Sequence, residues 1–455
     1  MLAAMSPSPD PTAQGPGVPD RAREDACPGA LRLHTADDGA LARVRLPGGL
    51  LTARQVRVLA DAAEALGDGH LETTSRGNVQ LRGLPDGCGL ELGTRLRAAG
   101  LLPSDRHERV RNIVASPLAG VDGNGHADTA TWARELDAAL CAADWTTGLS
   151  GRFLFALDDG RGDVAGLDAD VTLIASPDGT ALLRLGRATT ALQVPAAEAV
   201  PAALLAAERF LALLRATGTR AWRIREADPD GTLLTLPGRP VRALPVLPGT
   251  LPQAGPVAGP GGRYGLCAGL PFGRAEAGRW RLLAEAADAG AGELRVTPWR
   301  GAVVPGLLPD AAVHWAERLA AAGLGLDPHS PWELAMACTG TPGCAKSLAD
   351  VRADAARALA ADGADGADGA DGPAGQRLLP VHWSGCARRC GHPAGEWVDV
   401  LATGDGYQVS VRSGAPQART EQAVTAQAVT VQAVEQQAVT TQQMAEAVAR
   451  ARRTK

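Results

Sequence analysis

Four cysteines in the C-terminal part of the chain form two close pairs, and their side chains are well suited to metal chemistry. Cys338 and Cys344 are separated by five residues, and Cys386 and Cys390 by three. Forty-one residues lie between the pairs, so the fold must bring two distant loops together. Two such pairs can supply the four thiolates that a 4Fe-4S cluster requires. The spacing therefore predicts a 4Fe-4S cluster on these four cysteines.

The residues around the first pair are consistent with this prediction. Gly340, Pro342 and Gly343 predict a tight loop whose amides could donate hydrogen bonds to cluster sulfurs. A helix is expected directly after Cys344, where its N-terminal dipole would favour a thiolate. The apolar face of this helix is formed by Leu348, Val351, Ala355 and Leu359. The alternatives are free thiols and a structural zinc site, although zinc ligands usually come in pairs spaced by two to four residues.

The elements that must position this chemistry begin near residue 31. Residues 41–46 alternate apolar and basic side chains, which predicts a half-buried strand that ends at Pro47. A helix is expected over 52–66, because Thr52 and Gln55 form a capping pattern at its start. A second strand-like stretch covers 71–84.

The same order of signals returns in the second half of the chain. Leu270-Pro271-Phe272-Gly273 resembles Leu46-Pro47-Gly48-Gly49 at an offset of 224 residues (270 minus 46). The stretch 294–301 follows the one that begins at 71 at an offset of 223 (294 minus 71). A helix with Trp280, Leu283 and Ala287 on one face lies between the two landmarks. The nearly equal offsets predict an internal duplication, with a site between two pseudo-symmetric halves.

The cysteine spacing and three further segments resemble the sulfite and nitrite reductase superfamily. Its members carry a Cys-x5-Cys and a Cys-x3-Cys pair in their C-terminal half. The further segments are 73–83 (Thr-Thr-Ser-Arg-Gly-Asn-Val-Gln-Leu-Arg-Gly), 111–120 (Arg-Asn-Ile-Val-Ala-Ser-Pro-Leu-Ala-Gly) and 149–154 (Leu-Ser-Gly-Arg-Phe-Leu). Together the matches run from residue 31 to residue 411.

This resemblance implies an α+β fold of duplicated ferredoxin-like half-domains plus two α/β sirohaem/iron-sulfur lobes, in a pseudo-twofold, sulfite-reductase-like architecture. In the haem-containing members the last cysteine of the quartet also bridges the cluster to sirohaem iron, and that residue would be Cys390. Sirohaem or an additional non-haem iron is therefore a second cofactor to consider. Arg76, Arg111 and Arg152 would line the pocket over the tetrapyrrole face as catalytic residues.

One position departs from the sulfite and nitrite reducers. They carry a lysine two residues after the basic residue of the third segment, where this chain has Leu154. Losing a cation and a proton donor disfavours reduction of a small oxyanion. The segment 38–49 and the small first half instead resemble precorrin-3B synthases, which use dioxygen to hydroxylate precorrin-3A and form a ring lactone in aerobic cobalamin synthesis.

The precorrin-3B synthase resemblance implies a monooxygenase whose 4Fe-4S cluster relays electrons. The alternatives are a sirohaem-dependent sulfite or nitrite reductase and a non-catalytic zinc- or cluster-stabilised binding protein. No Gly-x-Gly-x-x-Gly motif follows a strand, so a separate ferredoxin or NAD(P)H-linked reductase is expected as electron donor.

Arginine suits a carboxylate-fringed tetrapyrrole because its planar guanidinium binds carboxylates bidentately. Arg43, Arg45 and Arg295 lie in segments that are also expected to face the cleft. The residues predicted to bind substrate are Arg76, Asn78, Arg82, Arg111, Asn112, Arg152 and Arg300.

Composition excludes several other classes of protein. The net charge is −5 and the basic residues are spread along the chain, which argues against nucleic-acid binding. No apolar run is long enough to cross a membrane, and the N-terminus lacks the pattern of a signal peptide, so a cytoplasmic location is expected.

Composition and pattern also predict seven segments. In chain order they are a disordered extension (1–29), the first half-domain (30–105), the first α/β lobe (106–243), a linker (244–262), the second half-domain (263–325), the cluster-binding lobe (326–413) with a flexible Ala-Asp-Gly repeat (361–372), and a low-complexity tail (414–455) that is either a loose helix or disordered.

Overall fold

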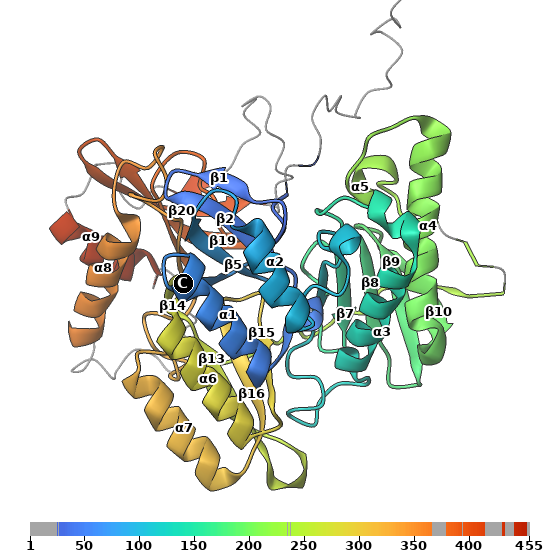
Figure 1. Cartoon of the computed structure of the whole chain (residues 1–455), viewed down its shortest axis with the longest axis horizontal. Coiled ribbons are helices and arrows are strands. Elements are labelled where there is room, and N and C mark those ends of the chain that lie inside the picture. Colours follow the sequence, from blue (N-terminus) through green and yellow to red (C-terminus); the bar gives the residue numbers. More distant parts are fainter. Residues whose placement is uncertain are drawn as a thin grey trace, which may run out of the picture. The chain divides into compact units, whose positions relative to one another are not determined.

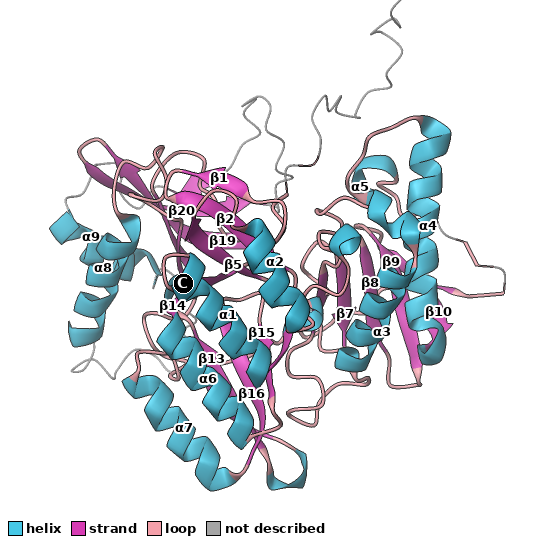
Figure 2. Cartoon of the chain, viewed as in Figure 1, coloured by secondary structure: helices cyan, strands magenta, loops and turns pink. Residues whose placement is uncertain are grey.

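The computed structural model describes residues 25, 27–233, 235–236, 238–365, 379–393, 395–414, 430–432 and 441–452. They form two compact units (Figure 1). The first unit comprises Arg109–Ser116 and Gly125–Thr250 together with Asp25 and Cys27, and the second comprises Pro28–Glu108, Pro117–Asn124 and the described residues from Leu251 onward. Helices and strands occur in both units (Figure 2), which confirms the predicted α+β class. No helix among the described residues is long and apolar enough to cross a lipid bilayer.

A six-stranded sheet, in the order β11-β10-β9-β8-β7-β6, forms the centre of the first unit. Strands β6, β7 and β8 are parallel, and the remaining neighbours are antiparallel. Helices α3 and α4 contact this sheet and each other, and Phe153, Phe155 and Phe210 form the aromatic part of its core. The elements are β6 (Ile113–Ala115), α3 (Thr129–Ala142), β7 (Phe155–Asp158), β8 (Val171–Ala175), β9 (Thr180–Leu185), β10 (Thr190–Pro195), α4 (Ala199–Thr217), α5 (Ile224–Ala227) and β11 (Val241–Ala243).

Two five-stranded sheets in the second unit exchange a strand. Their orders are β1-β2-β5-β4-β14 and β12-β13-β16-β15-β3. Strand β3 of the first half pairs with β15 of the second, and β14 of the second half pairs with β4 of the first. The strands are β1 (His34–Ala36), β2 (Gly39–Val44), β3 (Leu50–Thr52), β4 (His70–Thr73), β5 (Val79–Leu84), β12 (Gly255–Ala258), β13 (Tyr264–Gly269), β14 (Arg274–Glu276), β15 (Glu293–Val296) and β16 (Gly301–Leu307). Each half thus completes the sheet of the other.

Helices α1 (Ala53–Leu66) and α6 (Ala277–Ala289) lie side by side against these sheets (Figure 1). The predicted capping box of Thr52 and Gln55 is present at the start of α1. Trp280 and Leu283 of α6 enter the same hydrophobic core as Val56 of α1. Helices α2 (Gly89–Ala98) and α7 (Pro309–Ala321) follow the second strand pair of each half. The internal duplication is therefore confirmed.

A third sheet in the second unit carries the cysteine loops. Its order is β17-β18-β19-β20-β21, with β17, β18 and β19 parallel and the other pairs antiparallel. The elements are β17 (Ala335–Ala337), α8 (Val351–Asp365), β18 (Val381–Ser384), β19 (Gly395–Thr403), β20 (Gly406–Gly414), β21 (Thr430–Gln432) and α9 (Thr441–Arg452). This sequence of pairings repeats that of β6 to β10, so the duplication extends beyond the half-domains.

The stretch 71–84 is a hairpin, which corrects the prediction of one continuous strand. Gly77 has a φ of 63°, and its amide donates to the carbonyl of Thr74, so the chain reverses between β4 and β5. Arg76 consequently lies in a turn. The second half repeats this turn, since Arg300 has a φ of 65° and follows Gly77 by 223 residues (300 minus 77).

The helix expected directly after Cys344 begins later, at Val351. Asp350 sets its start, because its side chain accepts a hydrogen bond from the amide of Ala353 at 3.1 Å. Val351, Ala355 and Leu359 are buried as predicted, but Leu348 is 62% exposed. Cys344 is therefore not at a helix N-terminus.

Four low-complexity or linker predictions have different outcomes. Helix α8 continues through Asp365, so the start of the Ala-Asp-Gly repeat is helical and the rest of it lies outside the described residues. The expected linker contains β12. In the C-terminal tail, α9 packs into the core of the cluster-binding lobe through Met444 and Val448, among others. Most of the extension 1–29 lies outside the described residues.

Candidate metal centre and substrate-binding residues

The two cysteine loops meet where the parallel strands β17 and β18 end. Cys338 directly follows β17, and Cys386 comes two residues after β18. The amide of Cys338 donates to the carbonyl of Trp383 at 2.9 Å. The amide of Gly385 donates to Sγ of Cys338 at 3.2 Å. The fold thus brings the two distant cysteine pairs to one edge of one sheet.

The surroundings of Cys338 fit a thiolate ligand. Burial raises the pKa of its thiol, while hydrogen bonds from the amides of Gly385 and Gly340 act in the opposite direction. Amides that point at a sulfur stabilise its anionic form, as the ligands of an iron-sulfur cluster require. A Cβ on Gly385 would lie 1.8 Å from Oγ of Ser347, so only glycine permits this close approach of the two loops. The donor set and the backbone around it are therefore compatible with a cluster.

The loop of the second pair is fixed on β19. Nε of Arg389 donates to Oδ2 of Asp399 at 2.7 Å, and the ring of His392 stacks on Trp397 with the centroids 4.9 Å apart. Cys390 is exposed, whereas the other three cysteines of the quartet are partly buried.

Two of the predicted substrate-binding residues in the first unit have partners inside the protein. Arg111 is buried and donates to both carboxylate oxygens of Asp137 on α3, at 2.6 and 2.7 Å. Asn112 is buried and donates to the carbonyl of Phe153 at 3.1 Å. These contacts favour a structural role over the predicted contact with substrate.

The same holds for two residues of the first half-domain. Oδ1 of Asn78 accepts from the amide of Leu46 at 2.9 Å, which fixes the end of the β2 segment. Arg82 donates to both carboxylate oxygens of Asp38 at 2.8 Å and to the carbonyl of Gly343 at 3.1 Å. The guanidinium of Arg82 therefore faces the first cysteine loop.

Arg76 and Arg152 lie in more open places. Arg76 is partly exposed in the turn after β4. The guanidinium of Arg152 lies over the ring of Trp222, 4.1 Å from its centroid, which is a cation-π contact. These two residues belong to different units.

Arg300 lies beside the loop of the second cysteine pair. Its only hydrogen bond among the described residues runs from Nη1 to the carbonyl of Phe272 at 3.3 Å, and no described carboxylate lies within ion-pair distance. A Cβ on Gly391 would lie 3.4 Å from Nη2 of Arg300, so the guanidinium contacts the residue after Cys390. Burial lowers the pKa of Arg300, although arginine stays charged in proteins. A desolvated cation of this kind is suited to bind an anion.

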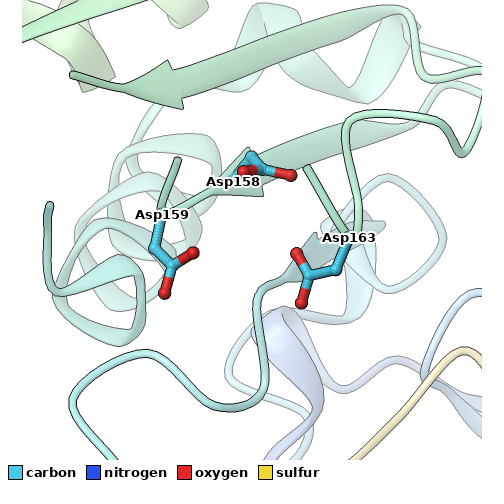
Figure 3. A group of neighbouring side chains, drawn as sticks. All are labelled: Asp158, Asp159 and Asp163. Atoms are coloured by element: carbon cyan, nitrogen blue, oxygen red, sulfur yellow. The ribbon is translucent and has the colours of Figure 1, made fainter. Parts of the chain in front are cut away.

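Three aspartates of the first unit gather at the end of β7, a group that the sequence analysis missed (Figure 3). Their oxygens lie within 4.8 Å of one another and all three residues are buried. Asp158 accepts from four backbone amides, and Asp159 pairs with Arg161 at 2.7 Å. Burial raises the pKa of Asp163 to about 7. The segment Asp-Asp-Gly-Arg-Gly-Asp after a buried strand was the available signal, and the contacts indicate a loop anchor.

Comparison with known proteins places this architecture in a recognised class. The family model described as nitrite/sulfite reductase ferredoxin-like half domain matches residues 34–87 and 257–322, the two strand-exchanged halves. The structure of the NirA protein of Mycobacterium tuberculosis has a similar fold, with a TM-score of 0.66 and 21% identity, over 90% of this chain and 79% of that one.

Similarity in sequence extends along most of the chain. A precorrin-3B synthase from Sinorhizobium sp is 29% identical over 408 residues, which cover 88% of this chain and 86% of that protein. A ferredoxin–nitrite reductase from Leptolyngbya laminosa is 42% identical over 89 residues, or 19% of this chain and 18% of that protein. The chain belongs to the sulfite and nitrite reductase superfamily, and it is an oxidoreductase-type enzyme.

Proposed function

We propose that the protein is a precorrin-3B synthase-like monooxygenase, which uses dioxygen to hydroxylate precorrin-3A and form a ring lactone. The observation that carries this proposal is the similarity to a precorrin-3B synthase over 88% of the chain. The similarity to the nitrite reductase from Leptolyngbya laminosa is higher but covers only 19% of the chain.

The proposed redox centre is a 4Fe-4S cluster on Cys338, Cys344, Cys386 and Cys390. The convergence of their loops at the ends of β17 and β18 supports this assignment. When bound, such a cluster supplies electrons one at a time. The electrons would come from a separate ferredoxin or reductase in the cytoplasm.

Arg300 is the residue that we propose to bind a substrate carboxylate near the cysteine loops. Its left-handed φ of 65° is unfavourable for a residue with a Cβ, and the equivalent turn uses Gly77. Strained residues of this kind persist where function requires the side chain. The desolvated guanidinium beside Gly391 would gain a charge-assisted, bidentate partner from a carboxylate. Arg76 and Arg152 are further candidates for contacts with substrate.

The surroundings of Leu154 argue against a small oxyanion as substrate. Leu154 is 3% exposed, and its amide donates to Asp170 in the core of the first unit. A leucine at this buried position provides neither the cation nor the proton donor that oxyanion reduction requires.

The test is turnover of precorrin-3A by purified protein with dioxygen and a chemical reductant. We expect a product that has gained one oxygen atom from labelled dioxygen. Consumption of nitrite or sulfite together with sirohaem absorption bands, and no hydroxylated product, would support the sirohaem-dependent reductase instead. A colourless zinc protein without turnover would support the non-catalytic alternative.

A further inference from the structure

The turn between β1 and β2 carries two adjacent aspartates that reach the first cysteine loop. Ala36 and Gly39 are paired residues of this hairpin, so Asp37 and Asp38 form its two-residue loop. Two-residue hairpin loops are tightly constrained by the strands that flank them. The aspartates therefore project from a rigid mount in the first half-domain.

Asp37 holds the peptide group that follows Cys344. Its Oδ2 accepts a hydrogen bond from the amide of Ala345 at 2.7 Å. A charged acceptor makes such a bond stronger than a neutral one would. Asp37 is exposed, so solvent competes with this bond and limits its strength.

Asp38 holds the peptide group that precedes Cys344, through Arg82. The Asp38 carboxylate accepts from Nε and Nη2 of Arg82, both at 2.8 Å, and Nη2 also donates to the carbonyl of Gly343 at 3.1 Å. The Arg82 side chain is 9% exposed, so this contact is largely shielded from water. The carbonyl of Gly343 and the amide of Ala345 belong to the two peptide bonds on either side of Cys344.

Gly343 is required for this approach. A Cβ at this position would lie 2.8 Å from Oδ2 of Asp38 and 2.6 Å from the side chain of Thr339. Any other residue would push the hairpin turn away from the loop. The contact therefore depends on residues from the first half-domain and from the cysteine loop together.

We propose that Asp37, Asp38 and Arg82 are positioning residues that fix Cys344 for cluster binding by anchoring both of its flanking peptide groups from the β1–β2 turn. This inference rests on the proposed 4Fe-4S site and adds to it a support in a different part of the chain. It also gives Arg82 a role other than the predicted contact with substrate. Asp37 has two separable effects, because it supplies both an acceptor oxygen and a negative charge near Cys344.

The test compares Asp37→Ala, Asp37→Asn and Arg82→Lys with the wild-type protein, each purified with its cluster under anaerobic conditions. The readouts are the rate at which a chelator removes iron and the reduction potential of the cluster. Asp86→Ala is the control, because Asp86 is an exposed aspartate of the same half-domain.

Arg82→Lys is expected to lose iron about tenfold faster, since lysine cannot donate to Asp38 and Gly343 with the same fork. Asp37→Ala is expected to lose iron several-fold faster. Asp37→Asn keeps an acceptor oxygen, so its iron loss should match that of the wild type. Both Asp37 variants should shift the reduction potential to more positive values, because a nearby negative charge disfavours the added electron.

Alkylation of Cys344 in the apoprotein provides a readout that does not need the cluster. We expect faster alkylation of Cys344 in Asp37→Ala and Arg82→Lys than in Asp86→Ala, and no change in Asp37→Asn. Wild-type rates and potentials in all three variants would overturn the positioning role while the cluster assignment stands. A wild-type protein that binds zinc or no metal would overturn both. If Arg82→Lys does not fold, the two Asp37 variants still decide between these outcomes.

Discussion

Arg300 and Asp163 are single residues at which the structure keeps an unfavourable local state. Arg300 has a left-handed backbone where glycine would be easier, and Asp163 places a carboxyl group in a buried site. Neither property follows from the sequence, because each depends on neighbours far along the chain. The sequence did single out Arg300, but as one of several arginines with the same expected role. The partners of Arg82 and Arg111 are tertiary contacts, so their engagement could not be predicted.

Arg300→Gly separates strain from binding. The glycine relieves a backbone cost of about 1 to 2 kcal/mol, so stability should stay equal or rise. Removing the guanidinium should raise KM for the tetrapyrrole about tenfold or more, because a charge-assisted hydrogen bond contributes roughly 1.5 to 3 kcal/mol. Thermal unfolding and steady-state kinetics provide the two measurements.

Gly77→Ala is the matched control in the equivalent turn. It should lower stability by about 1 kcal/mol without a change in KM, since its φ is also left-handed. A less stable Arg300→Gly protein with an unchanged KM would show that Arg300 has a structural role.

Asp163→Asn should change how stability depends on pH. The folded pKa of about 7 lies above the ordinary value of 3.8, so the folded state keeps a proton that the unfolded state releases. The resulting stabilisation is fully present below about pH 4 and is lost as the pH rises to about 7. Asparagine does not titrate, so the variant should gain up to roughly 4 kcal/mol relative to the wild type across this range.

Denaturant unfolding at pH 5 and pH 8 measures this gain. Asp230→Asn, at an exposed aspartate of the same unit, is the control and should follow the wild-type profile. Parallel profiles for wild type and Asp163→Asn would contradict the raised pKa of Asp163.

At the scale of elements, local signals predicted the helices better than the pairing of the strands. The capping residues Thr52 and Gln55 correctly predicted the start of α1, because a capping box involves only neighbouring residues. The alternating pattern from 71 to 84 continues through the β4–β5 turn, so it did not reveal the hairpin. The exchange of β3 and β14 depends on partners more than 200 residues apart, which no local pattern encodes.

Helix α9 is an element whose packing the repetitive sequence concealed. Arg452 is 1% exposed and donates to the carbonyls of Leu379 at 3.0 Å, Pro331 at 2.5 Å and Glu333 at 2.7 Å. Arg452→Ala would leave three carbonyls without this donor and should lower the unfolding free energy by about 3 kcal/mol in a denaturant titration. Arg450→Ala, at an exposed position of the same helix, is the control. Equal stability of the two variants would show that Arg452 does not anchor α9.

At the scale of the whole molecule, the duplication links the sequence to the fold. Equal offsets predicted two related halves, and the family model matches both of them. The same strand pairings in the sheets of β6–β10 and β17–β20 extend the repeat to the lobes. Spacing alone predicted the cysteine quartet, because each pair is local. That the pairs meet beside β17 and β18 required the structure.

The content of iron and acid-labile sulfide in anaerobically purified protein tests the proposed cluster most directly. We predict about four iron and four sulfide per chain in the wild type, and a loss of both in Cys386→Ser, because cluster assembly requires all four thiolates. Zinc in place of iron, or full iron and sulfide content in Cys386→Ser, would contradict the account.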